Sequence, residues 1–343
     1  MANNTQHYKR VILAGVGGPE ALEVITAPLP EPEPGEVRIK VQATGISFAD
    51  VACRLGKYPT APTRPFTPGY DLAGVVDALG AGVTGLNVGQ PVAAILPKFG
   101  ANAEYVTVPE ALVVPMPEGL DPAAAVSIVL NYLTAHRLLH KTASVQPGER
   151  VLVHSAAGGV GTALLELGRI AELALYGTAS QAKHDLLQQY GATPIDYRSE
   201  DFVARIGELT NGEGVDVVMD AVGGEVFRRS YGILRRGGRL ISYGYLSAAS
   251  GGPLTVPVTL LRVYLYRLRP DGKRTLFYGS TPPMARSDNA WYRETLGELL
   301  RLLHAGQITP VIGARFPLDE VADAHALFDE KAVRGKIVLV NAE

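Results

Sequence analysis

Short apolar runs separated by turn residues fill the first third of the chain. Residues 37–41 and 106–108 are rich in β-branched side chains, and glycine and proline are frequent between such runs. Strands joined by turns have this pattern. Residues 10 to about 115 are therefore predicted to form a mainly β domain.

A different pattern begins near residue 150, where short apolar strands alternate with amphipathic helical stretches. Strands are predicted at residues 150–154, 173–178, 215–220, 239–243 and 275–279. This alternation is the signature of βαβ units and a parallel sheet. The predicted fold class is α/β.

The C-terminal segment contains two further helices and a closing strand. The helices are predicted at residues 291–304 and 319–330, and the strand at 336–340. Asp319 and Glu320 stand at the start of the second helix, where negative side chains suit the helix dipole. Because this segment follows the parallel sheet, we expect it to return to the first domain.

Length and composition describe a two-domain globular protein. At about 150 residues per domain, 343 residues suggest two domains, and the chain is 47% hydrophobic and 19% charged. The 32 Lys and Arg nearly balance the 34 Asp and Glu, so no long-range field favours nucleic acid or an anionic membrane. The local basic residues are expected to form a solvated face: Arg228, Arg229, Arg235, Arg236, Arg239, Arg262, Arg267 and Arg269.

Other sequence features favour a cytoplasmic protein. Cys53 is the single cysteine, which makes an internal disulfide impossible and fits a reducing compartment. Residues 1–7 are polar and predict no signal peptide. The most apolar stretch, 123–139, is interrupted by Asn131 and His136, which predicts a buried helix and no membrane span.

A glycine-rich turn follows the strand at 151–154. It reads Ser155-Ala156-Ala157-Gly158-Gly159-Val160-Gly161 and runs into a predicted helix at 162–171. Gly158 and Gly161 occupy the last two positions of the G-x-G-x-x-G pattern, and Ala156 replaces the first glycine. Small residues let the backbone approach a pyrophosphate, whose charge is met by N–H groups at the helix N-terminus. Residues 157–161 are therefore predicted to bind a dinucleotide.

The end of the second strand favours NADPH over NADH. An NAD enzyme places a carboxylate there against the ribose hydroxyls. This chain has Ala179-Ser180 and then Lys183, a hydroxyl and a cation suited to a 2′-phosphate. In the alternative interpretation, Ser180 caps the helix and Lys183 is solvated. Tyr197, just after the third strand, either covers the adenosine end or packs against the protein.

The domain order and the turn resemble the medium-chain dehydrogenases/reductases, in particular their quinone oxidoreductase branch. The runs most similar to the VAT-1 homologues of that branch are 154–161, 177–180, 183–184, 194–197 and 214–220. The resemblance implies a GroES-like, mainly β catalytic domain formed by residues 1–128 and 282–343. It also implies a Rossmann domain at 129–281, with a doubly wound parallel sheet that binds NADPH, and a homodimer.

The residues that hold zinc in other members of this family are replaced here. The resemblance aligns Ser47, Tyr70, Asp71 and Asn131 with positions that carry Cys, His, Glu and Cys or Asp in zinc alcohol dehydrogenases. A zinc site needs three or four converging ligands. Residues 93–103 also lack the cysteines of the family's structural zinc lobe. We expect a zinc-independent enzyme and no bound metal.

Two histidines at helical spacing, His136 and His140, do not change this expectation. A third ligand is missing, so surface or packing roles are expected for both.

Without a metal, hydride transfer suits an acceptor that is already electrophilic, such as a quinone or an α,β-unsaturated carbonyl. The resemblance implies that residues 47–50 and 57–59 line its pocket. Tyr58 is the candidate hydrogen-bond donor to the acceptor oxygen, or else an ordinary packed aromatic. Ser47 stands where relatives often carry Asn, and Asp50 is expected to organise the loop.

Further candidate cofactor contacts come from the ends of predicted strands, where ligands of such sheets bind. These are Val222, Gly244, Tyr245 and Tyr278. Asn131, in an apolar helix, needs a partner, which is either the cofactor or a neighbouring backbone group. Lys336 is a further candidate contact to phosphate or substrate.

Two functions compete at this point. One is an NADPH:quinone oxidoreductase-like enzyme or enone reductase, a homodimer whose partner pairs across the strand near residues 275–279. The other is a VAT-1-like nucleotide-binding adaptor with little catalysis, associated with a membrane or a partner protein. An exposed apolar patch would favour the adaptor, and none is evident in the sequence. The acceptor depends on loops such as 247–257, whose conformation the sequence does not give.

Overall fold

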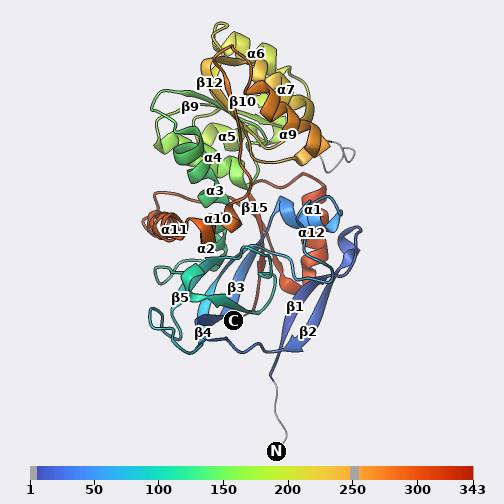
Figure 1. The fold of residues 1–343 in the computed structure, drawn as a ribbon, viewed down its shortest axis with the longest axis vertical. Coiled ribbons are helices and arrows are strands. Elements are labelled where there is room, and N and C mark those ends of the chain that lie inside the picture. Colours follow the sequence, from blue (N-terminus) through green and yellow to red (C-terminus); the bar gives the residue numbers. More distant parts are fainter. Residues whose placement is uncertain (1–5, 248–254, 343) are drawn as a thin grey trace, which may run out of the picture. The chain divides into compact units, whose positions relative to one another are not determined.

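The computed structural model describes residues 6–247 and 255–342. The chain forms two compact units, which Figure 1 shows in the colours of the sequence. The first unit comprises Met1–Leu133 and Thr281–Glu343, and the second comprises Thr134–Ser280. Most of the predicted loop 247–257 lies outside the described residues.

The first unit is built on antiparallel β structure. A hairpin pairs β1 (His7–Leu13) with β2 (Leu22–Pro28). The larger sheet has the order β14-β15-β3-β4-β5-β7, and β6 pairs with β3. Its strands are β3 (Glu36–Ile46), β4 (Asp71–Leu79), β5 (Pro91–Ile95), β6 (Tyr105–Pro109), β7 (Val113–Pro115), β14 (Ile312–Pro317) and β15 (Lys336–Val340).

Burial along β3 follows the alternation in its sequence. Val37, Ile39, Val41 and Ala43 are buried, while the residues between them are partly exposed. β15, from the C-terminal segment, pairs antiparallel with β3 and places Ile337 beside Ile46. The C-terminal segment therefore completes the sheet of the first unit.

Helices complete the first unit. They are α1 (Phe48–Arg54), α2 (Pro122–Ser127), the π-helical η3 (Ile128–Tyr132), α10 (Thr281–Ser287), α11 (Asn289–His304) and α12 (Val321–Asp329). The stretch at 123–139 was expected to be one buried helix. It is instead divided by π-helical turns, with Asn131 inside η3 and the second π-helical segment, η4 (Arg137–Ala143), in the second unit. Among the described residues, no helix is both long and apolar enough to cross a membrane.

The second unit contains six parallel strands in the order β10-β9-β8-β11-β12-β13. In chain order this is 3-2-1-4-5-6, the order of a doubly wound dinucleotide-binding sheet, so the predicted fold class is confirmed. The strands are β8 (Arg150–Val153), β9 (Ala174–Ala179), β10 (Thr193–Asp196), β11 (Val215–Asp220), β12 (Leu234–Ser242) and β13 (Arg274–Phe277). All six residues of β11 are buried, as expected for a central parallel strand.

The described helices of this unit include α4 (Gly159–Ile170), α5 (His184–Gln189), α6 (Phe202–Leu209), α7 (Gly224–Gly232) and α9 (Thr255–Tyr266), and α3 (Leu133–His136) begins at the boundary between the units. The predicted strand at 239–243 begins earlier than expected, at Leu234. Arg235 and Arg236 therefore lie on the strand, ahead of the range expected for it.

Candidate cofactor and acceptor sites

The glycine-rich turn connects β8 to α4. Ser155 takes up a left-handed conformation (φ 58°), and Gly158 is the residue that caps α4. A Cβ at Gly161 would lie 2.4 Å from the Ser155 carbonyl oxygen and 2.6 Å from that of Ala156, which no side chain tolerates. The N–H groups of the first turn of α4 have no partner within the helix. The residues of the glycine-rich turn beside them have small side chains or none. The arrangement suits a pyrophosphate.

β9 supports this turn from the neighbouring position in the sheet. The Ala156 N–H donates to the Thr178 carbonyl oxygen at 3.1 Å. A Cβ at Gly177 would lie 2.8 Å from the Ala156 Cβ. Gly177 is therefore part of the site, although sequence reasoning singled out only the turn itself. The signal was a glycine inside an apolar strand, which marks a close approach of another segment.

His154 is a second residue that sequence reasoning missed. Its Nδ1 lies 3.1 Å from the Thr178 hydroxyl and its Nε2 lies 2.8 Å from the Ser230 hydroxyl, so the imidazole links β8 to β9 and α7. Burial lowers the pKa of His154 to about 3. The imidazole is neutral at physiological pH. Its two hydrogen bonds hold the chain in place just before the glycine-rich turn.

At the end of β9, hydroxyl and cationic groups take the place of a carboxylate. Ser180 precedes the short 3-10 helix η5 (Gln181–Lys183), and its side chain makes no capping hydrogen bond. The Tyr197 N–H lies 3.4 Å from the Ala179 carbonyl oxygen, which places Tyr197 beside Ser180 with its ring half exposed.

The next residue, Arg198, adds a cation that the sequence analysis did not select. Its guanidinium carbon lies 5.8 Å from the centre of the Tyr197 ring. The nearby carboxylate of Asp196 is occupied, because it accepts hydrogen bonds from the Arg198 N–H and the Ser199 hydroxyl. These two hydrogen bonds, the Ser199 hydroxyl foremost, lower the pKa of Asp196 and keep it charged within its own turn.

The predicted contacts at the strand ends lie together at the carboxyl edge of β11, β12 and β13. The Asp220 carboxylate accepts hydrogen bonds from the N–H groups of Val222 (2.8 Å) and Gly223 (3.0 Å), and burial raises the pKa of Asp220 to about 6. A Cβ at Gly244 would lie 2.9 Å from the Ala221 carbonyl oxygen.

Two tyrosines complete this edge. The ring centre of Tyr245 is 6.0 Å from that of Phe277, and the Tyr278 N–H donates to the Ser242 carbonyl oxygen at 2.9 Å. Val222, Gly244, Tyr245 and Tyr278 therefore belong to the strand edge at which the glycine-rich turn also lies.

In the first unit, the loop before α1 is organised by one buried carboxylate. The Asp50 Oδ2 accepts hydrogen bonds from the Ser47 hydroxyl (2.6 Å) and the Ser47 N–H (2.8 Å). The Asp50 Oδ1 accepts one from the Gly69 N–H at 2.8 Å. Desolvation raises the pKa of Asp50, against the lowering effect of these three donors. The Ser47 hydroxyl is thus committed to Asp50 as a donor.

Tyr58 belongs to an aromatic cluster beside this loop. Its hydroxyl oxygen lies 3.2 Å from that of Tyr70. The Phe99 ring stacks on Tyr70 with centres 3.9 Å apart and meets Tyr58 edge-on at 5.9 Å. Burial is the main cause that raises the pKa of Tyr70, and the neighbouring Tyr58 adds to it. Tyr70 therefore stays protonated and holds the Tyr58 hydroxyl in one place.

Asp71 and Lys336 form a buried ion pair next to the loop. The Lys336 Nζ lies 2.5 Å from the Asp71 Oδ2, and both side chains are almost wholly buried. A Cβ at Gly45 would lie 2.0 Å from the Lys336 Cε, so a glycine at 45 makes room for the lysine. The sequence analysis selected Lys336 as a contact to phosphate or substrate. The structure instead places its ammonium group against a carboxylate inside the first unit.

Asn131 is buried in η3 of the same unit. The rings of His136 and His140 lie on one helical face with centres 4.6 Å apart, and burial lowers the pKa of His136 to about 4. Within residues 6–247 and 255–342, no group of three or more His, Cys, Asp or Glu side chains could hold a metal ion.

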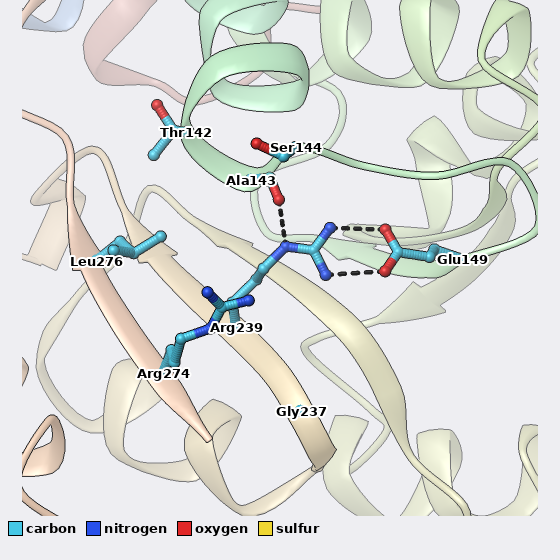
Figure 2. A pocket seen from close by; sticks show the side chains of 8 residues that line it. All are labelled: Thr142, Ala143, Ser144, Glu149, Gly237, Arg239, Arg274 and Leu276. Atoms are coloured by element: carbon cyan, nitrogen blue, oxygen red, sulfur yellow. Dashed lines mark hydrogen bonds and ion pairs between the residues drawn. The ribbon is translucent and has the colours of Figure 1, made fainter. Parts of the chain in front are cut away.

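A cavity of about 300 Å³ lies on the amino-terminal side of the strands of the second unit, opposite the side of the glycine-rich turn (Figure 2). Arg239 is the central residue there: its guanidinium donates to both oxygens of Glu149, at 2.9 and 2.6 Å, and to the Ala143 carbonyl oxygen. Arg239 was expected on a solvated face. That expectation is wrong, because the side chain is buried and paired. Arg274, directly beside it on β13, also lines the cavity.

Two protein families match successive parts of the sequence. Residues 33–118 match the family described as alcohol dehydrogenase GroES-like domain, and residues 190–339 match the one described as zinc-binding dehydrogenase. A synaptic vesicle membrane protein VAT-1 homolog of Rattus norvegicus is 35% identical over 339 residues, 96% of this chain and 83% of the relative. A quinone oxidoreductase of Pseudomonas aeruginosa is 36% identical over 338 residues, 97% of this chain and 99% of the relative. The chain belongs to the medium-chain dehydrogenase/reductase family.

Solved structures agree with this membership. The Escherichia coli quinone oxidoreductase complexed with NADPH has a TM-score of 0.87 and 28% identity, over 97% of this chain and 99% of that chain. The human VAT-1 homolog-like protein has a TM-score of 0.82 and 28% identity, over 98% and 99%. The CurK enoyl reductase has a TM-score of 0.81 and 27% identity, over 98% and 99%. The predicted GroES-like domain is confirmed, and the relatives support an oxidoreductase of this family.

Proposed function

We propose that this medium-chain dehydrogenase/reductase is an NADPH-dependent reductase that passes hydride, without zinc, to a quinone or an α,β-unsaturated carbonyl compound. The observation that carries the proposal is the end of β9. A glycine-rich turn suited to a pyrophosphate lies beside β9, which is followed by Ser180 and Lys183. The carboxylate of Asp196, at the end of the neighbouring β10, already accepts two hydrogen bonds. The likeness to a quinone oxidoreductase complexed with NADPH supports it.

In this proposal the second unit is the NADPH-binding domain. The backbone of residues 157–161 binds the pyrophosphate. Ser180 and Lys183 meet the 2′-phosphate, Tyr197 covers the adenosine end, and Arg198 adds a further positive charge. The residues assigned to the nicotinamide end are Val222, Gly244, Tyr245 and Tyr278, with Asn131 of the first unit as a further candidate contact.

The first unit is assigned the acceptor. NADPH supplies the hydride, and reduction of a quinone to a hydroquinone then needs one proton for each hydride. The Tyr58 hydroxyl is the proposed donor to the acceptor oxygen, and Tyr70 positions it through the contact between the two hydroxyls. Ser47 and Asp50 are assigned to the shape of the loop, because the Ser47 hydroxyl and both Asp50 oxygens already have partners.

Zinc independence is part of the proposal. Asp71, which the resemblance aligns with the glutamate of the family's zinc site, is neutralised by Lys336 at 2.5 Å. A metal ion at that carboxylate would have to displace a buried ammonium group, which leaves an unpaired buried charge. Electrophilic acceptors do not require the Lewis acid that alcohol oxidation uses.

The deciding experiment is a fluorescence titration of chelator-treated protein with NADPH and NADH, followed by an acceptor panel of 1,4-quinones and enones. We expect NADPH to bind at least about tenfold more tightly, as a charge-assisted contact to one phosphate predicts. Tighter binding of NADH contradicts the assignment of Ser180 and Lys183. Turnover that appears only after addition of zinc contradicts the metal-free chemistry.

A cytoplasmic homodimer completes the proposal. β13 is the last strand of its sheet, and a second copy would pair along its other edge. The lone buried cysteine supports a reducing compartment. Light scattering on the purified protein tests the homodimer, and a monomer at micromolar concentration would contradict it.

A further inference from the structure

Among the described residues that line the cavity of Figure 2, two are arginines and one is a carboxylate. Arg239 on β12 and Arg274 on β13 are register partners in adjacent parallel strands, so their side chains leave the same face of the sheet. Thr275, the next residue, points to the other face, where its hydroxyl donates to the Val263 carbonyl oxygen of α9 at 2.6 Å. The cavity therefore lies on the face of the sheet opposite α9.

The carboxylate neutralises the first of these arginines. Both oxygens of Glu149 accept hydrogen bonds from the Arg239 guanidinium, at 2.9 and 2.6 Å. One of them also accepts a hydrogen bond from the Gln146 N–H at 2.9 Å. Glu149 is thus held in place against Arg239 by the chain on both sides of the ion pair.

The second arginine has no such partner. Within residues 6–247 and 255–342, the Arg274 side chain makes no hydrogen bond, ion pair or ring contact, and it is exposed to solvent. Its neighbour Arg239 carries the same charge, and like charges at adjacent register positions repel each other. With two arginines and one glutamate, the described lining carries one positive charge in excess.

The rest of the lining suits a small anionic molecule. Thr142 and Ser144, at the end of η4, bring hydroxyl-bearing side chains, and Leu276 adds an apolar one two residues beyond Arg274. A guanidinium presents paired N–H donors that match two oxygens of a carboxylate or a phosphate. The volume of about 300 Å³ is at the lower end of the range of small-molecule sites.

We propose that this cavity binds a small oxyanion, whose carboxylate or phosphate group is held by Arg274. The site lies at the start of β12 and β13, whereas Tyr245 and Tyr278, which are assigned to the nicotinamide, follow the other ends of these strands. The oxyanion and the cofactor therefore occupy separate sites on one sheet. This inference goes beyond the proposed reductase and does not depend on it.

A second copy of the chain along β13 leaves the cavity in place. Strands pair at an edge through backbone N–H and C=O groups, while their side chains project above and below the sheet. Arg274 and Leu276 point to one of these faces, so edge pairing does not engage their side chains. An acidic side chain of the second copy is the competing source of negative charge, and the test separates it from a free anion.

The test is isothermal titration calorimetry of the full-length protein with succinate and with inorganic phosphate at constant ionic strength. We expect at least one probe to bind at millimolar concentration or below, and the tighter probe identifies the group that is recognised. Arg274→Gln should lower this affinity at least about tenfold, as the loss of a charge-assisted contact predicts. Arg169→Gln, which removes an exposed arginine from the last turn of α4, is the matched control.

Each titration is repeated with saturating NADPH, because an oxyanion can also bind at the glycine-rich turn. We expect the affinity for the probe to be unchanged. Competition with NADPH places the anion at that turn and overturns the proposal. Equal binding by Arg274→Gln and Arg169→Gln overturns it too, as does a wild-type protein that binds neither probe.

Far-ultraviolet circular dichroism and a thermal melt confirm that both variants are folded, and light scattering gives their mass. If the wild type is a dimer that binds neither probe and Arg274→Gln is a monomer, Arg274 belongs to the contact between copies. That result assigns its charge to a partner side chain and overturns the oxyanion site.

Discussion

The glycine-rich turn of the second unit and the loop before α1 of the first unit are held in place by opposite means. The conformation of the turn requires a residue without a side chain, since a Cβ at Gly161 would lie 2.4 Å from a carbonyl oxygen. The conformation of the loop depends on the Asp50 carboxylate, which accepts three hydrogen bonds. Changes at the turn should therefore act through steric exclusion, and changes at the loop through lost hydrogen bonds and uncompensated polar groups.

The largest effect is expected at the turn. Gly161→Ala should abolish NADPH binding and destabilise the protein by about 2 kcal/mol, because the added methyl group has only backbone to displace. Titration of the variant with NADPH and its urea unfolding measure both quantities. Gly158→Ala is the control for stability, since its Cβ would meet no protein atom closer than 3.4 Å and its φ of −82° is allowed to alanine. Equal loss of unfolding free energy in both variants would refute the steric explanation.

Next in size is the effect of Tyr58→Phe on turnover. Removal of the proposed donor should lower kcat by about 100-fold, the lower range for general acid catalysis, and leave NADPH affinity unchanged. Tyr70→Phe should lower kcat less, by several-fold, because the donor remains but loses the partner that orients it. Steady-state kinetics with a quinone and an enone measure these changes. A wild-type kcat for Tyr58→Phe would show that Tyr58 is a packed aromatic side chain and not the donor.

Asp50→Asn tests the loop directly. The amide cannot accept all three hydrogen bonds that the carboxylate accepts, and one of its own donors faces an N–H or O–H group. A loss of about 2 kcal/mol in the free energy of unfolding is expected. Ser47→Ala removes one donor only and should cost about 1 kcal/mol. If Asp50→Asn unfolds at the wild-type urea concentration, Asp50 does not organise the loop.

The effect that is smallest near neutral pH, and grows only as pH falls, is the pH dependence that His154 adds to the turn. The pKa of His154 is about 3 in the folded protein and about 6.5 in an unfolded chain. Between these values the unfolded state binds the extra proton, so stability falls as pH falls below 6.5, by about 1.4 kcal/mol per unit. Asp220 acts in the opposite sense between about pH 4 and 6, because its folded pKa of about 6 exceeds the usual Asp value.

Urea unfolding of the wild type and of His154→Gln from pH 7 to pH 4 isolates the histidine, since Asp220 contributes equally to both. The difference in unfolding free energy between the two proteins should shrink steadily as pH falls. A constant difference would show that His154 does not remain neutral in the fold.

The two regions also differ in how far the sequence predicts them. The turn could be predicted in detail because its constraints are local: a strand, small residues and a helix follow one another in 151–171. The partners of the loop could not, because Asp50 meets Gly69 and Asp71 meets Lys336 from distant parts of the chain. Lys336 therefore seemed available for a phosphate, and Arg239, whose partner is Glu149, seemed solvated.

α9 shows a second limit of prediction. No helix was predicted at residues 255–266, where α9 lies, although these residues are mostly apolar. Only the folded structure shows which face of that helix is buried against the second unit. Pattern predicts that a segment is apolar, whereas packing decides how much of it is left exposed.

The pairing of β15 with β3 has a consequence for biosynthesis. Residues 134–280 are contiguous, so the entire second unit has left the ribosome before Lys336 is added to the chain. The first unit cannot be completed until β15 has been synthesised. Until then Asp71 lacks Lys336 as its partner, and the part of β3 that pairs with β15 lacks its neighbour, while more than half of the protein is translated. The nucleotide half can thus fold first, while the other half is the more exposed to chaperones and to aggregation.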